Sequence, residues 1–231
     1  MLEIDGGNNF RQTMAGVCLI LATLVLALAQ LVHPGQGEAG FVQTMADNPG
    51  RVEAASLLVI LSSVLFVPAL VGLLRLMRDC GTVLGLIGVS LTLIGAIGHA
   101  VWAGFEIVLV WMANSEIDRA QLSAAVDGGP PSGIGFTLIL LMFTAGFFLG
   151  LIFLVAGLLR SRNVPWWAAV LIAVGPLVEF LPLDNKAVFM TGLALFVVGF
   201  SVIGLKLMSG PVAERAPFSG ETRVGARPRV Q

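Results

Sequence analysis

The sequence predicts an all-α integral membrane protein, a polytopic bundle of transmembrane helices. The first observation is composition: 57% of the 231 residues are hydrophobic and 12% are charged, against about 45–50% and about 25% in soluble domains. A soluble globule of this size cannot bury so much apolar surface in one core. The second observation is that the apolar stretches are long and continuous, whereas a membrane β-barrel shows alternating segments of about 10 residues. Soluble, disordered, collagen-like and disulfide-rich classes are thereby excluded.

Six apolar stretches are candidates for crossing the hydrocarbon core, which takes about 20 mostly apolar residues per helix. They are residues 14–32, 54–77, 82–113, 133–159, 166–181 and 187–208. The third is too long for one perpendicular crossing, and the fifth is short and contains Pro176. We therefore expect one six-helix transmembrane domain over residues 1–208. The tail 209–231 is rich in Pro, Gly, Arg and Glu and is expected to be a disordered cytoplasmic segment.

Lysine and arginine are unequally divided between the two sides of this topology. Ten lie on one side: Arg11, Arg75, Arg78, Arg160, Arg162, Lys206, Arg215, Arg223, Arg227 and Arg229. Three lie on the other: Arg51, Arg119 and Lys186. Because cytoplasmic loops carry the excess of basic residues, both termini are predicted to be cytoplasmic.

The N-terminal stretch also resembles a cleavable signal sequence. Arg11 precedes an apolar run that ends in Ala27-Leu28-Ala29, a pattern of small residues typical of cleavage sites. The run is long for a signal peptide, and the ten-to-three bias fits six spans. An uncleaved first span is therefore the favoured interpretation.

Ionisable residues inside a span are candidates for function, because burying them in a membrane is costly. His99 and Glu106 lie seven residues apart in the third span, on the same helix face and about 10.5 Å apart along the axis. Glu179 lies near the outer end of the fifth span, His33 at the outer end of the first, and Arg51 at the start of the second. These five residues predict a polar pocket that faces outward.

Three functions are compatible with such residues. The favoured one is binding or transport of a small molecule or an ion in the outward-facing pocket. The alternative is a structural or accessory membrane protein without a substrate. A haem or metal site is the third, with His33 and His99 as axial ligands on separate helices, although their spacing gives it no support. The sequence contains no nucleotide-binding, serine-hydrolase or zinc-protease motif, so nothing in it indicates an enzyme.

The expected partners are the lipid bilayer and the ligand of the pocket. A net charge of −1 offers no general basic surface for nucleic acid. Ala96, Ala100 and Gly104 form a small-residue ridge on the third span. Other faces of the same span carry the glycines Gly88, Gly95 and Gly98, which have no side chain. Such residues allow close helix packing, within the chain or in a homo- or hetero-oligomer.

Several local motifs resemble those of a known group of proteins. They are RQTMAG at residues 11–16, NPGR at 48–51, VPAL at 67–70 and LLR at 73–75. Together with the topology they resemble small bacterial six-span membrane proteins that are classed as a domain of unknown function. The resemblance implies a six-helix bundle in a bacterial cytoplasmic membrane, and it carries over no functional residues.

Overall fold

The computed structural model describes residues 4–35, 40–78, 80–126, 134–179 and 186–209, and these ranges contain helices and no strand. The all-α prediction is therefore confirmed for the described chain. The elements are α1 (Ile4–Val32), α2 (Phe41–Asp47), α3 (Pro49–Leu73), a 3-10 turn η1 (Leu74–Met77), α4 (Thr82–Ala113), α5 (Arg119–Val126), α6 (Ile134–Leu141), a π turn η2 (Met142–Gly146), α7 (Phe147–Ser161), α8 (Trp166–Glu179) and α9 (Lys186–Ser209).

Five helical segments are long and apolar enough to cross a membrane: residues 10–32, 49–77, 82–113, 134–161 and 187–209. They confirm five of the predicted stretches as long apolar helices. The sixth, α8, is apolar but has only 14 residues, so it is about 21 Å long. By contrast the 32 residues of α4 extend about 48 Å, well beyond the ~30 Å thickness of a hydrocarbon core.

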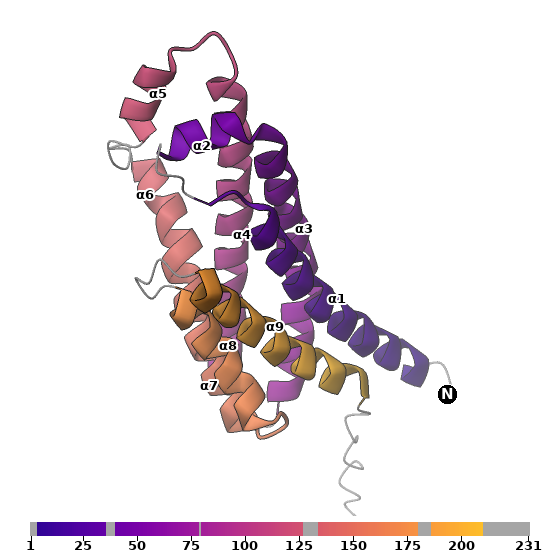
Figure 1. Cartoon of the computed structure of the whole chain (residues 1–231). Coiled ribbons are helices and arrows are strands. Elements are labelled where there is room, and N and C mark those ends of the chain that lie inside the picture. Colours follow the sequence, from indigo (N-terminus) through magenta and orange to yellow (C-terminus); the bar gives the residue numbers. More distant parts are fainter. Residues whose placement is uncertain (1–3, 36–39, 79, 127–133, 180–185, 210–231) are drawn as a thin grey trace, which may run out of the picture.

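The long helices pack in chain order into a closed ring. Contacts run from α1 to α3, from α3 to α4, from α4 to α7, from α7 to α8, from α8 to α9, and from α9 back to α1. In Figure 1 the short helices α2 and α5 lie at one end of the bundle, beyond α8 and α9. We call this the cap end. The opposite end, where α1 begins and α9 ends, is called the terminal end.

Side chains exposed on the outside of the ring are largely apolar. Each long helix contributes such residues, for example Leu24, Val64, Ile97, Ile152 and Val198, all at least 40% exposed. A soluble protein rarely exposes continuous apolar surface of this extent. The outer surface of the ring is therefore suited to contact with lipid chains.

Glycine allows α4 and α7 to pack with their backbones nearly in contact. A Cβ atom added to Gly95 would lie 2.6 Å from Cα of Phe147, and one added to Gly98 would lie 2.5 Å from the backbone nitrogen of Phe143. Gly88 meets the backbone of Leu154 in the same way. Gly104, in contrast, has nothing within 4 Å. The close packing of α4 therefore uses the Gly88, Gly95 and Gly98 faces.

The segment formed by α6 and α7 contains one turn of π-helix, η2, at this close approach. The added Cβ of Gly98 would meet Met142 and Phe143 of η2, and that of Gly146 would lie 3.2 Å from the backbone nitrogen of Gly95. The Thr144 hydroxyl donates to the carbonyl of Leu140, at 2.6 Å, within this segment. Single π turns inside α-helices occur frequently at functional sites. The residues that surround η2 are therefore candidates for a functional site.

Two separate hydrophobic cores stabilise the molecule. The larger one fills the ring and includes fully buried residues of α1, α3, α7 and α9, such as Leu19, Leu70, Leu154 and Phe200. The smaller one joins α2 and α5 to the last turns of α4 at the cap end, with its members Val42, Met45, Ala46, Val52, Leu109, Val110, Ala113 and Leu122. The last turns of α4 are thus covered by protein where the ring no longer surrounds them.

Candidate functional site

Glu106 is buried between α4 and α3 and its two carboxyl oxygens have separate hydrogen-bond donors. The hydroxyl of Ser56 donates to Oε2 at 3.0 Å, and the indole nitrogen of Trp102 donates to Oε1 at 2.9 Å. Glu106 is only 7% exposed. Because Trp102 lies one turn before Glu106 on α4, it shares the same helix face. The carboxyl group is therefore held by both helices.

His33, just after the last residue of α1, completes this group. Its Nε2 atom lies 3.5 Å from Oε1 of Glu106 and is buried without a hydrogen-bond partner. Its Nδ1 atom accepts a hydrogen bond from the backbone nitrogen of Gly35 at 3.0 Å, so in the neutral ring the proton lies on Nε2 and faces the carboxylate. Gly35 has a φ of 77°, a left-handed conformation that glycine adopts without strain.

Arg51 lies beside this group without joining it. Its Nε atom donates to the carbonyl of Val32 at 3.0 Å, one of the carbonyls that the end of α1 leaves without an intrahelical partner. The guanidinium thereby ties the end of α1 to the first turn of α3. It fixes the segment that carries His33, and its side chain remains exposed at the cap end.

His99 lies in a different environment on the same helix. Its Nδ1 atom is 2.9 Å from the carbonyl of Gly95, one turn earlier. The imidazole ring packs against Phe143 of η2 at a centroid distance of 4.2 Å and against Phe147 of α7 at 4.8 Å. The described residues give it no carboxylate neighbour. His99 therefore faces aromatic rings rather than the polar group around Glu106.

The ring of His99 forms part of the wall of a cavity inside the bundle. Its volume is about 560 Å³, within the ~300–1,000 Å³ typical of ligand sites. The wall comes from α1, α4, η2, α7, α8 and α9: Leu26, Gln30, His99, Phe143, Phe147, Phe148, Pro176, Phe189, Leu193 and Phe196. Gln30 lies in the last turn of α1 and Phe189 in the first turn of α9, so the cavity lies toward the cap end of both helices.

The structure thus distributes the five predicted site residues over three places. His33 and Glu106 lie together, with Arg51 beside them. His99 lines the cavity. Glu179 is the last residue of α8, and its side chain lies outside the described part of the chain. One aromatic path joins the first two places, because Trp102 contacts Phe143 at 5.9 Å and Phe143 contacts His99.

The geometry gives the haem and metal alternatives no support. Both ring nitrogens of His33 face other groups of the protein, the Gly35 amide and the Glu106 carboxylate. Within the described residues, no cluster of three or more His, Cys, Asp or Glu side chains could hold a metal ion. His99 is among the described residues that line the cavity, whereas His33 is not.

Sequence reasoning missed most of the residues that complete these two sites. Ser56 and Trp102 are not ionisable, and Gln30 was part of an ordinary apolar span. The phenylalanines of the cavity wall were indistinguishable from lipid-facing ones. One signal was available: Trp102 lies four residues before Glu106, at the spacing that brings side chains together on a helix.

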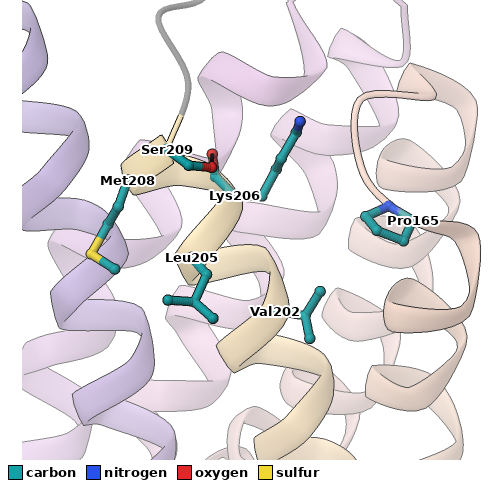
Figure 2. Close-up of a pocket in the computed structure, with 6 residues that line it drawn as sticks. All are labelled: Pro165, Val202, Leu205, Lys206, Met208 and Ser209. Carbon is teal, nitrogen blue, oxygen red and sulfur yellow. Dashed lines mark hydrogen bonds between the residues drawn. The ribbon is translucent and has the colours of Figure 1, made fainter.

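A second hollow lies at the terminal end, between the beginning of α8 and the end of α9. It measures about 400 Å³ and is lined by Pro165, Val202, Leu205, Lys206, Met208 and Ser209. In Figure 2 the Lys206 side chain extends toward the side of Pro165, whereas Met208 points away from it. Among the described residues that line this hollow, Lys206 alone is charged, and the others are mostly apolar.

Comparison with known protein families, with curated proteins and with solved structures finds no match to this chain. The resemblance to bacterial six-span proteins therefore stays a prediction.

Proposed function

We propose that this chain is a membrane protein that binds a small, largely apolar molecule in the cavity beside His99, as a binding or transport-type protein. The observation that carries the proposal is the cavity itself, a site of ligand size inside a membrane-type bundle. Its described wall consists largely of aromatic rings and includes two polar side chains, His99 and Gln30. Largely apolar pockets with a few placed polar groups are the usual form of small-molecule sites. The π turn at its wall adds support.

The proposed orientation places six spans in a bacterial cytoplasmic membrane, with both termini in the cytoplasm and the cavity open to the outer side. Its support is the distribution of charge. Six cations of the described helices and turns lie at the terminal end: Arg11, Arg75, Arg78, Arg160, Arg162 and Lys206. Three lie at the cap end: Arg51, Arg119 and Lys186, the first residue of α9. An excess of this kind marks the cytoplasmic side.

Photolabelling tests the cavity. Membrane vesicles containing the protein are irradiated with an alkylphenyl diazirine, a lipophilic photoreactive probe, and the labelled residues are mapped. We expect saturable labelling of cavity residues such as Phe189. Leu193→Trp, which fills the cavity, should abolish that labelling, and Val198→Trp on the lipid-facing side of the same helix should not. Labelling confined to lipid-facing residues and unaffected by Leu193→Trp would overturn the proposal.

The natural cysteines test the orientation. Cys80 is exposed and Cys18 is buried, and Cys80 lies at the terminal end. A membrane-impermeant maleimide should therefore label Cys80 only after the membrane is opened, and Cys80→Ser should remove the signal. In the Cys80→Ser background, Ser115→Cys at the exposed cap end should react in intact cells. Labelling of Cys80 in intact cells would reverse the topology.

The structural or accessory alternative keeps one specific observation in its favour. The partners of Glu106 all belong to the protein, and they join α4 to α3 and to the end of α1. Such a closed group stabilises a bundle without needing a ligand. We therefore assign Glu106, Ser56 and His33 a structural role, and we place binding at His99.

A further inference from the structure

The hydrogen bond of His99 determines which kind of polar atom the cavity receives. The carbonyl oxygen of Gly95 can only accept, so the Nδ1 atom of His99, 2.9 Å away, carries a proton. Among the described residues no carboxylate lies against the ring, and an isolated charge in apolar surroundings is costly. The neutral ring then has its lone pair on Nε2. A ligand in the cavity would therefore find a hydrogen-bond acceptor at Nε2 of His99, a residue of the cavity wall.

The wall around this acceptor favours an aromatic ligand. Phe143 and Phe147 lie against His99, and Phe147 continues to Phe196 at a centroid distance of 6.2 Å. Phe148 and Phe189 also line the cavity. Aromatic rings pack on one another in offset or edge-to-face arrangements that contribute beyond the area they bury. A wall of five phenylalanines is thus well matched to a ring.

The described part of the cavity wall carries no charged side chain. None of the ten described residues that line the cavity is an Asp, Glu, Lys or Arg. A charged ligand would lose its hydration without gaining an ionic partner, which is unfavourable. The second polar group, the amide of Gln30, can both donate and accept, and it has no hydrogen-bond partner among the described residues. The ligand is accordingly neutral and carries few polar atoms.

We propose that the cavity binds a neutral, phenol-like ligand, an aromatic ring with an apolar substituent whose hydroxyl donates to Nε2 of His99. This inference rests on the proposed function, because it identifies the chemical class that the cavity takes. It follows from the juxtaposition of one acceptor nitrogen, one amide and five aromatic rings, with no charged side chain among the described residues of the wall.

Competition against the photolabel tests the ligand class with a matched pair of probes. 4-Hexylphenol and 4-hexylanisole differ in one methyl group, which removes the donor. Their concentrations are compared as amounts dissolved in the membrane. We expect the phenol to compete about fivefold better, the ratio that corresponds to one net hydrogen bond. His99→Leu should reduce the ratio to about one, whereas His33→Leu, at the histidine outside the cavity, should preserve it.

The outcomes distinguish failure of the phenol inference from failure of the proposed binding function. If the two probes compete equally in the unmodified protein, the phenol inference is wrong and the cavity remains a binding site. If neither competes for labelling that Leu193→Trp abolishes, the phenol inference is also wrong, whereas labelling that Leu193→Trp leaves unchanged overturns the proposed function as well. A preference that survives in His99→Leu would also overturn the inference, since the donor would then be recognised elsewhere.

Discussion

The Glu106 group and the His99 cavity lie on the same face of α4, two turns apart, and they differ in how their polar atoms are satisfied. Both oxygens of Glu106 accept hydrogen bonds from the protein. The hydrogen bond that His99 makes within the described part of the chain stays in its own helix, and its ring lines a cavity. A polar residue in a membrane helix is thus structural where neighbouring helices satisfy it, and available for a ligand where they do not.

The cause of the difference is the neighbouring helix. At Glu106, α3 supplies the hydroxyl of Ser56 and the end of α1 supplies His33. At His99, α4 faces η2 and α7, which approach closely through Gly95 and Gly98 and present phenylalanine rings. Substitutions at Glu106 and its partners should therefore destabilise the protein more than substitutions at His99.

Glu106→Leu should destabilise the protein by about 3 kcal/mol, because it leaves the donors of Ser56 and Trp102 buried without acceptors. The measurement is unfolding in detergent micelles, followed by helical circular dichroism. Glu53→Leu, at an exposed carboxylate at the cap end, is the matched control and should change stability by at most about 0.5 kcal/mol. Similar effects for the two variants would contradict a structural role for Glu106.

Gly98→Leu should cost about 2 kcal/mol, since any side chain there meets the backbone of Phe143 and pushes η2 away from α4. Gly104→Leu is its control. Nothing lies within 4 Å of Gly104, and leucine has the better helix propensity, so that variant should be neutral or slightly stabilised. Thermal unfolding compares the two. Equal destabilisation would show that the glycine faces are not what separates the His99 environment from that of Glu106.

Ser56→Ala should cost about 1 kcal/mol through the loss of its hydrogen bond to Glu106. In the Glu106→Leu background the same change should be almost without effect, a coupling that a double-mutant cycle measures. Ser63→Ala is the control, because its hydroxyl bonds only within α3, to the carbonyl of Val59. Additive effects of Ser56→Ala and Glu106→Leu would argue against a shared group.

His99→Leu should change stability least, by less than about 1 kcal/mol. The carbonyl of Gly95 keeps its ordinary helical partner, the backbone N–H of residue 99, so the substitution leaves no buried group unsatisfied. Unfolding of this variant and Glu106→Leu in the same detergent gives the comparison directly. A loss as large as that of Glu106→Leu would assign His99 a structural role as well.

Much of the fold could be predicted from the sequence because hydropathy depends on local composition. The third predicted span, 82–113, coincides with α4, and the stretch 187–208 lies within α9. The helix α2 lies between the first two predicted spans and was not predicted, since its stability depends on packing against α4 and α5. The π turn η2 was also invisible, because it lies in an uninterrupted apolar run.

Hydropathy is enough to predict the membrane class, the approximate helices and the rarity of polar residues inside them, since each follows from the free energy of placing a side chain in lipid. Which of those polar residues have partners depends on how the helices pack. Heptad spacing placed His99 and Glu106 on one face of α4, but a helix face is shared among several neighbours around the ring. Near Glu106, α3 and the end of α1 supply hydrogen-bonding and charged partners. Near His99, η2 and α7 supply aromatic rings, and the residue lines a cavity.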